Sequence, residues 1–215
     1  SSTFKLPYLT DSEVDELIIL LQKHKSLNHL ENMTYEQKKE ALGKKAGRQL
    51  LVALHEATLG EPFPKIVFDE YEHIYPENAK SLYLTVCLMH RLNVPTRAGL
   101  ISRVHSIPFN KFQENLFAPL EHVVFAEYDN KFRDYTYVTR HPHIAEMVFE
   151  QALKEPSDRY DEYMRLVNAL DIDYSSDRYA FHKIIKAREL LSLFPDRSLA
   201  RNLFSAAKKR LSDDP

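Results

Sequence analysis

Glycine is scarce in this chain, and the shortage excludes several kinds of site. Only 4 of the 215 residues are glycine. The sequence contains none of the signatures Gly-x-x-x-x-Gly-Lys-Ser/Thr, Gly-x-Gly-x-x-Gly and Gly-x-Ser-x-Gly. Loops that wrap phosphates, and turns that present a nucleophilic serine, depend on these glycines. The sequence therefore predicts no self-sufficient catalytic site, and we expect that this chain alone is not an enzyme and binds no cofactor.

Cysteine is rarer still, with Cys87 alone in the sequence. One cysteine cannot form a disulfide within the chain, and this favours a reducing compartment such as the cytoplasm. Because Cys87 lies in an apolar stretch, we expect an inert buried thiol rather than a nucleophile. The sequence has no Cys-x-x-Cys or His-Glu-x-x-His pattern, so it predicts no metal site.

Long apolar runs and an excess of one charge are also missing. No run approaches the roughly 20 apolar residues that cross a bilayer, so we expect no membrane partner. The chain has 29 Lys and Arg against 31 Asp and Glu, a balance that does not require a nucleic-acid partner. Its 44% hydrophobic content is sufficient for the core of one large domain or of two to three small ones.

What is present is mostly helical patterning, beginning with residues 1–76. Thr10 and Glu13 match a capping box, and apolar residues follow at helical spacing. A second capping box opens a helix that ends at the C′ glycine Gly60. The predicted helices of this helical subdomain are 10–24, 34–59 and 66–74.

Residues 77–155 change from helices to a hairpin and back. Two β-rich runs flank a turn at 129–131, and they predict a β-hairpin. Three helices precede the hairpin and one follows it, which is the order of a winged-helix domain. The predicted elements are helices 77–92, 96–104 with Thr96 as N-cap, 109–117 and 142–153, and strands 122–128 and 133–138.

Residues 156–215 return to helical spacing. The expected helices cover about 157–170 and 176–193, followed by a third that Asp196 caps. Helix pairs joined by short turns are typical of the first unit of a repeat array. The predicted fold is therefore mainly α: a helical subdomain, a winged helix with one small β-hairpin, and repeat-like helices.

Arg140 and His141 form the sharpest candidate site, at the junction of the hairpin and the helix at 142–153. Pro142 suits the first helical position, which makes His141 the N-cap. A helix N-terminus exposes N–H donors and a partial positive charge, so a phosphate contact is chemically sensible there. The alternative is that His141 only packs at a domain junction and that His143 is a surface residue.

A winged helix also suggests DNA binding, with residues 108–117 as the candidate recognition helix. That segment carries one Lys, one Glu and three Phe. A helix that reads a DNA groove needs Arg or Lys to neutralise phosphates. The composition instead predicts that the three Phe are core or interface residues and that nucleic acid is not the partner.

The segment from Leu84 to Leu153 resembles the winged-helix domain of STAND NTPases, which include plant disease-resistance and bacterial antiviral sensor proteins. The resemblance rests on the sequence Arg-His-Pro-His-Ile-Ala at 140–145, after the order helix, hairpin, helix. It implies that His141 senses the β-phosphate of bound ADP in a closed, resting state. Pro142 replaces the acidic residue that is common in plant members, so the hinge role of that residue is not implied here.

The resemblance also implies partners outside this chain. The nucleotide-binding core that holds ADP or ATP would lie upstream, and further tetratricopeptide-type repeats would lie downstream. We therefore expect a fragment that regulates a larger ATPase switch. The competing interpretation is a stand-alone helical or winged-helix module that binds proteins or DNA, and a small enzyme is a third alternative.

Overall fold

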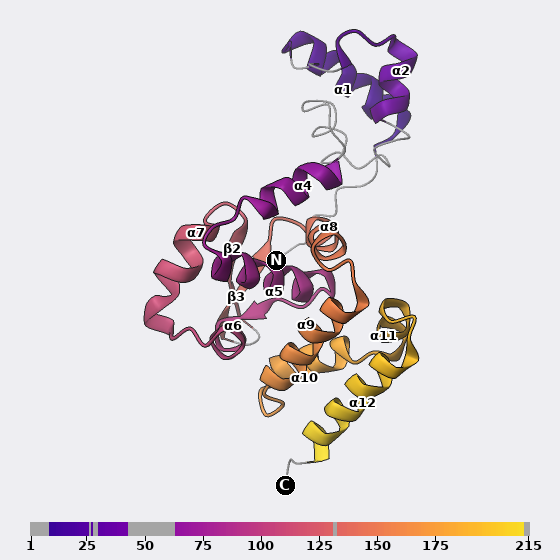
Figure 1. The fold of residues 1–215 in the computed structure, drawn as a ribbon. Helices are drawn as coiled ribbons and strands as arrows, with labels where there is room; N and C mark the ends of the chain where they lie inside the picture. The colour runs from indigo at the N-terminus through magenta and orange to yellow at the C-terminus, as the bar shows by residue number, and fades with distance from the viewer. Residues whose placement is uncertain (1–8, 26, 28–29, 43–62, 131–132, 213–215) are drawn as a thin grey trace. The chain divides into compact units, whose positions relative to one another are not determined.

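The computed structural model describes residues 9–25, 27, 30–42, 63–130 and 133–212. The chain divides into two compact units, residues 1–66 and residues 67–215, which are taken separately below. Figure 1 shows the helices and strands along the chain. The chain is mainly helical with one small sheet, which confirms the predicted fold class.

The described part of the first unit contains α1 (Asp11–Lys23) and α2 (Tyr35–Glu40). Both predicted capping boxes are present, with Thr10 capping α1 and Thr34 capping α2. Each N-cap hydroxyl accepts a backbone N–H from the third helical residue, and the side chain of that residue bonds back to the N-cap N–H. The predicted continuation from residue 43 to residue 59, and the C′ role of Gly60, lie outside the described residues.

Asp15 fastens these two helices together. Its carboxylate accepts a hydrogen bond from the Tyr35 hydroxyl (2.8 Å) and pairs with Lys39 (2.9 Å). Val14, Ile18 and Leu21 form the buried face of α1. The spacing i, i+4, i+7 that predicted an amphipathic helix is therefore the spacing of its buried side.

The second unit is built around α5 (Glu77–Arg91), which is buried on all sides over most of its length. In Figure 1, α5 lies between α8 (Pro142–Ala152) and the strands. The predicted helix at 77–92 is confirmed. Cys87 is fully buried within it, and burial raises the pKa of its thiol well above the ordinary range. The preceding helix, α4 (Phe63–Glu72), begins earlier and ends earlier than the predicted 66–74.

The sheet has three antiparallel strands in the order β1 (Thr96–Arg97), β3 (Asp134–Thr139), β2 (Val124–Asp129). The predicted hairpin is β2 with β3, in which Tyr128 lies opposite Tyr135. The prediction that Thr96 caps a helix was wrong, because Thr96 and Arg97 pair with β3 instead. The helix that follows, α6 (Ala98–His105), begins two residues later than predicted.

The segment between α6 and β2 is less regular than the predicted helix at 109–117. It comprises a 3₁₀ turn (Phe109–Lys111), a π-helical turn (Gln113–Phe117) and the short α7 (Ala118–Leu120). Pro119 does not stop the segment, because a proline is tolerated in the first turn of α7. Phe112 is buried and both Phe112 and Phe117 contact the Tyr137 ring, as expected of core residues, whereas Phe109 is 62% exposed and is not part of the core.

After the hairpin the chain is helical to residue 212. The elements are α8, α9 (Pro156–Ala169), α10 (Ser175–Ile184), α11 (Ala187–Leu193) and α12 (Arg197–Ser212). The single helix predicted at 176–193 is two helices, since α10 ends at Ile184 and Lys186 precedes α11 in an extended conformation. The Asp196 carboxylate accepts the Ser198 N–H (2.8 Å), as expected of a cap for α12.

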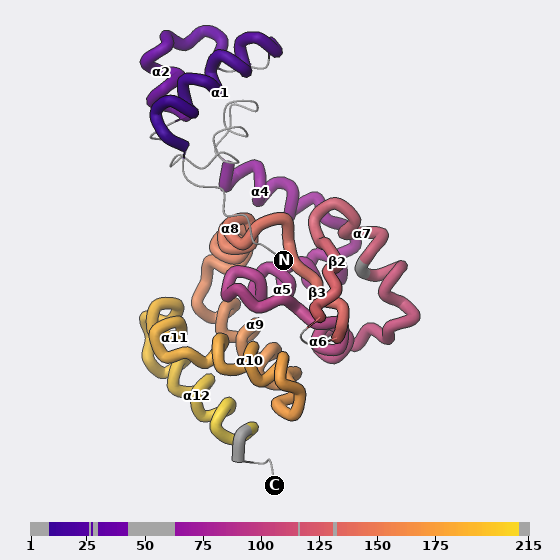
Figure 2. The backbone as a smooth tube through the Cα atoms, turned by 180° about the vertical axis from the view of Figure 1, so that it is seen from behind, coloured from indigo at the N-terminus to yellow at the C-terminus, as the bar shows by residue number. Residues whose placement is uncertain are grey.

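Buried polar contacts connect α5, β1 and α6 to the helices after residue 155. The Arg91 side chain of α5, 7% exposed, donates to Glu189 of α11 and to the Tyr163 hydroxyl of α9. In α10 the Asp177 carboxylate, 3% exposed, pairs with Arg103 and lies 3.7 Å from Arg97. Figure 2 shows α9 to α12 gathered at one end of this unit. The predicted boundaries at 76/77 and 155/156 stay predictions.

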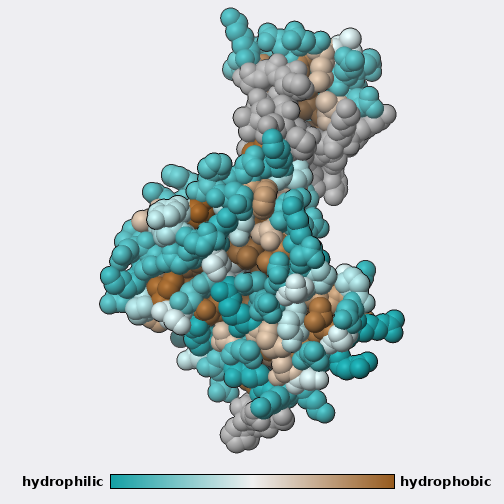
Figure 3. Space-filling view, viewed as in Figure 1, coloured by the Kyte–Doolittle hydropathy of each residue, from teal (hydrophilic) through white to brown (hydrophobic). Residues whose placement is uncertain are grey.

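The surface that faces the viewer in Figure 3 is largely hydrophilic, with small apolar patches. Among the described residues, no helix is both long enough and apolar enough to cross a membrane.

Candidate functional site at the start of α8

The candidate site is the turn in which β3 ends and α8 begins. Thr139 is the last residue of β3, and Pro142 is the first residue of α8. His141 between them has an extended backbone and is the N-cap, as the sequence predicted. Its carbonyl oxygen accepts the Ala145 N–H (3.2 Å), which is the first bond of the helix. The turn is therefore a regular helix start with a histidine in place of the usual short polar cap.

The His141 ring has one nitrogen engaged and one free of the cap. Nδ1 accepts the backbone N–H of His143 (3.1 Å), so in the neutral ring the proton must be on Nε2. Burial, and then the neighbouring His143, lower the pKa of His141. The ring is therefore neutral near pH 7. Because His141 is solvent-exposed, its Nε2–H can donate a hydrogen bond to an incoming acceptor such as a phosphate oxygen.

Arg140 lies beside this turn, but its charge is already paired. Its guanidinium donates to the carboxylate of Glu70 in α4. Both side chains are about one-third exposed, at 35% and 37%. The sequence analysis placed Arg140 at an anion site, and the C-terminal part of α4 carries three carboxylates, those of Asp69, Glu70 and Glu72. The structure pairs Glu70 with Arg140 and Glu72 with Lys80 (2.9 Å), so two of those carboxylates have specific partners.

A second histidine, His90 of α5, contacts the end of β3 at this turn. The sequence analysis did not predict this contact. Nδ1 of His90 in α5 accepts the Thr139 N–H (3.2 Å) and lies 2.8 Å from the Thr139 hydroxyl. That hydroxyl is 3.1 Å from the His141 carbonyl oxygen, to which it can donate. Burial, and then the nearby His141, lower the pKa of His90 to about 4. His90 is thus a neutral acceptor that fixes the end of β3, and only its position in an otherwise apolar helix marked it in the sequence.

The turn offers an anion three kinds of group. These are the Nε2–H of His141, the backbone N–H of Ile144, and the guanidinium of Arg140, which Glu70 now holds. In the rest of the first turn of α8, Pro142 has no N–H, and the N–H groups of His143 and Ala145 are already bonded to His141. The arrangement can hold or sense a negative charge. The Thr139 hydroxyl and Nδ1 of His90 lie 2.8 Å apart, but Thr139 is only 2% exposed, so this pair supports the turn and does not face an incoming substrate.

Other candidate chemistry is weaker in the described part of the chain. No group of three or more His, Cys, Asp or Glu side chains there could hold a metal ion. His105, the other strongly shifted histidine, bonds to the Thr85 hydroxyl (2.9 Å), and burial followed by Arg165 lowers its pKa to about 4. It lies in a packed polar cluster with Arg165, not at an open site.

Comparisons with protein-family models, with curated proteins and with solved structures found no significant match to this chain. The function must therefore be argued from the site itself.

Proposed function

We propose that this chain is the regulatory region of a larger STAND-type nucleotide switch, possessing a histidine that contacts the phosphate of ADP held by a nucleotide-binding core. The observation that supports the proposal is the state of the His141 ring. The cap bond at Nδ1 leaves the proton on Nε2, and the lowered pKa keeps the ring neutral. A neutral, exposed N–H donor at a helix start can recognise a phosphate through a hydrogen bond, and the histidine does not have to take up a proton first.

The ion pair of Arg140 with Glu70 suggests how such a contact could be coupled to the fold. A phosphate near His141 would attract the guanidinium, and Glu70 would compete for it. A nucleotide shifts a two-state equilibrium only through its different affinities for the two states. In the proposed switch, the resting state has the ADP contact and the active state lacks it. Such a switch would act in the cytoplasm, with the core and further repeats of the same protein as its partners.

The DNA-binding alternative has less support. The segment at 109–117 is not one regular helix that could lie in a major groove. Its single cation, Lys111, pairs with Glu114 at 2.9 Å. A titration of the chain with duplex DNA at low salt checks this alternative, and tight, salt-sensitive binding would favour it over the nucleotide switch.

The test of the proposal separates two roles of His141, its role as the N-cap of α8 and its proposed contact with the phosphate. The full reading frame is first examined for an upstream Gly-x-x-x-x-Gly-Lys-Ser/Thr motif, and the encoded protein is then purified and its bound ADP measured. His141→Asp keeps a good N-cap but replaces the donor by a negative charge. His141→Asn keeps both a cap acceptor and a donor, and His143→Ala keeps the backbone N–H that binds His141.

We expect His141→Asp to lose at least tenfold in ADP retention while the melting temperature of the nucleotide-free protein stays close to wild type. His141→Asn and His143→Ala should retain ADP. Absence of the upstream motif, or full ADP retention by His141→Asp, would end the proposal. The chain of residues 1–215 alone should show no change in melting temperature with millimolar ADP or ATP, because the groups that would bind the nucleotide lie elsewhere.

A further inference from the structure

The helices α11 and α12 enclose a shallow groove of about 350 Å³ on the second unit. Its apolar part includes Leu191, Ala200 and Phe204. Leu191 is 54% exposed although it lies beside the buried Leu190. A monomer usually covers such a leucine or leaves it isolated, but here it is one wall of a groove.

Three cations surround this apolar floor. Arg197, Arg201 and Lys208 of α12 line the groove, and within the described part of the chain their side chains have no ion-pair or hydrogen-bond partner. The other basic residues of the helix are engaged elsewhere, since Arg210 donates to the Leu170 carbonyl oxygen (2.6 Å) and Lys209 has a contact of its own. The cations that the fold does not use are therefore the ones at the groove.

The charge of α12 is also one-sided. Residues 197–212 include five Lys or Arg and no Asp or Glu. Asp196 precedes the helix, but its carboxylate is taken up by the N–H and the hydroxyl of Ser198 (2.8 and 2.7 Å). Glu189 on α11 is bound to Arg91. Neither of these two carboxylates, which precede α12 along the chain, is therefore available to compensate the positive potential at the groove.

We propose that the groove between α11 and α12 binds an acidic amphipathic helix of a partner protein. The apolar face of such a helix would lie on Leu191 and Phe204, and its acidic flank would face Arg197, Arg201 and Lys208. The inference does not depend on the nucleotide contact at His141.

Charge and shape favour this occupant over the alternatives. A small molecule is usually enclosed by its pocket, whereas this groove is open to solvent. A membrane surface fits a protruding apolar face, and the apolar side chains here line a hollow. Nucleic acid would need a longer basic track and no aliphatic floor. An acidic helix alone uses both the apolar floor and the cations.

The test uses the full chain and a fluorescein-labelled helical peptide of about 18 residues, with leucine at i, i+3, i+4 and i+7 and glutamate on the flanks. Binding is followed by fluorescence anisotropy at several salt concentrations. A peptide of the same composition in scrambled order controls for the apolar face, and the same peptide with lysine in place of glutamate controls for charge.

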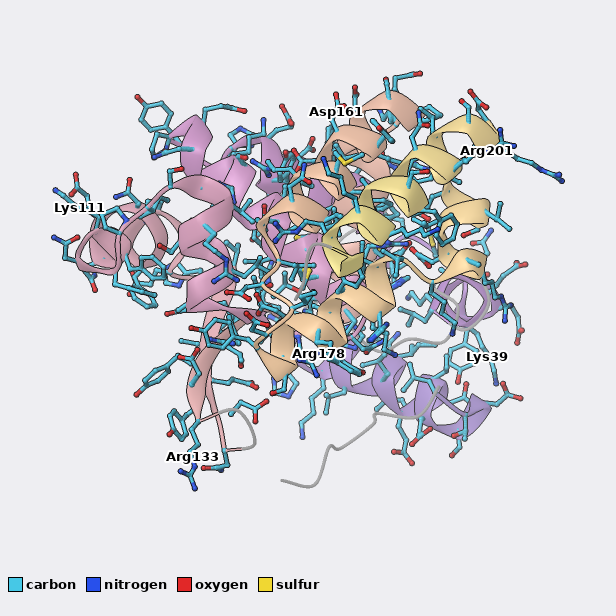
Figure 4. All side chains as sticks on the ribbon, turned by 90° about the horizontal axis from the view of Figure 1, so that it is seen from below. Lys39, Lys111, Arg133, Asp161, Arg178 and Arg201 are labelled. Carbon is cyan, nitrogen blue, oxygen red and sulfur yellow. The ribbon has the colours of Figure 1, made fainter. Side chains whose placement is uncertain are left out.

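Charge reversal locates the binding surface. Arg197→Glu/Arg201→Glu/Lys208→Glu should weaken binding by roughly tenfold or more, from three solvent-exposed charge pairs. Arg201→Glu alone gives a partial loss and serves if the triple variant unfolds. Leu191→Ser tests the floor at a residue that is already exposed. The matched control is Arg133→Glu, an exposed cation at the hairpin that Figure 4 shows far from Arg201.

We expect salt-sensitive binding of the acidic helix, weaker binding of both control peptides, and losses in the groove variants but not in Arg133→Glu. No binding of the acidic helix, or equal binding by the groove variants, would overturn the proposal. Single-stranded DNA or phosphatidylserine vesicles that bind as tightly, and that lose binding on the same charge reversal, would also overturn it by assigning the groove to nucleic acid or lipid.

Discussion

At the scale of single residues, Arg91 connects the most partners. Its guanidinium donates to Glu146 (2.8 Å), to Glu189 (2.8 Å) and to the Tyr163 hydroxyl (2.9 Å), and it lies 4.1 Å from the Phe149 ring centroid. The sequence analysis predicted only that Arg91 lies in a helix at 77–92. That interpretation missed the partners because they follow Arg91 by 55 to 98 residues.

Replacing Arg91 should be strongly destabilising. We expect Arg91→Ala to lower the free energy of unfolding by about 3 kcal/mol, because the Glu189 carboxylate keeps only the Tyr163 hydroxyl (3.1 Å) and loses the cation that balances its charge in a poorly solvated site. Arg91→Lys should cost less, since it keeps the charge but loses the forked geometry and the ring contact. Urea unfolding measures both. The control Arg201→Ala, at an exposed cation, should change stability by no more than about 0.5 kcal/mol.

Two partly buried histidines, His90 and His105, predict how the free energy of unfolding depends on pH. Burial lowers the pKa of His90 and of His105 to about 4, against 6.5 in an unfolded chain. Between these values the unfolded chain binds the protons first, so the free energy of unfolding should fall as the pH decreases from 6.5 to 4. Above pH 6.5 both states are neutral, and these groups give no pH dependence.

Chemical unfolding at pH 7, 6, 5 and 4 measures this slope. Carboxylates such as Asp15 and Asp196, whose pKa values are lowered, add to it at the acid end of the range. The double variant His90→Asn/His105→Asn should therefore be less stable at pH 7 but show a flatter profile from pH 6.5 to 5. A profile as steep as that of the wild type would contradict the assignment to these two histidines.

At the scale of elements, local sequence signals predicted well where helices begin. They failed to predict the short strand β1 and the break between α10 and α11. The caps at Thr10, Thr34 and His141 are confirmed, because a cap depends only on residues within one turn. The two-residue β1 has no periodicity of its own and exists only because β3 is beside it. The break near Lys186 has no Pro or Gly to mark it. At the candidate site, likewise, His141 could be predicted but the bonds from His90 and Glu70 could not.

The cap of α12 offers a prediction at this scale. Asp196 accepts hydrogen bonds from the Ser198 hydroxyl and from the Ser198 N–H, and these bonds, the hydroxyl bond first, lower the pKa of its carboxyl. Asp196→Ala should lower the melting temperature, whereas Asp196→Asn should stay close to the wild type because Asn is an equally good cap. Thermal unfolding followed by circular dichroism compares them. Equal losses in the two variants would show that the charge matters more than the cap bond.

At the scale of the whole molecule, the second unit is connected across the predicted boundary at 155/156 by buried polar groups. Asp177 of α10 accepts from Arg103 of α6 and from the backbone N–H of Asp171 (3.1 Å). Arg97 of β1 donates to Ser176 (2.5 Å). The Tyr163 ring of α9 packs against Phe149 of α8. Removing the helices after residue 155 would leave several of these groups unpaired or exposed.

Residues 67–155 alone should therefore not form a stable winged-helix domain, although their element order is that of one. Exposed apolar surface from α5 and α8, together with the loss of the Arg103 partners Ala169 and Asp177 and of the Arg91 partners Tyr163 and Glu189, should cost more than a small domain can offset. We expect residues 67–155 to melt without a sharp transition and to exchange amide hydrogens rapidly, and residues 67–215 to melt cooperatively. Should 67–155 instead give a sharp transition and a dispersed NMR spectrum, the boundary at 155/156 would be a true domain boundary. The contacts of Asp177 and Arg91 would then be an interface between two independently folding domains, across which a nucleotide-dependent rearrangement could act.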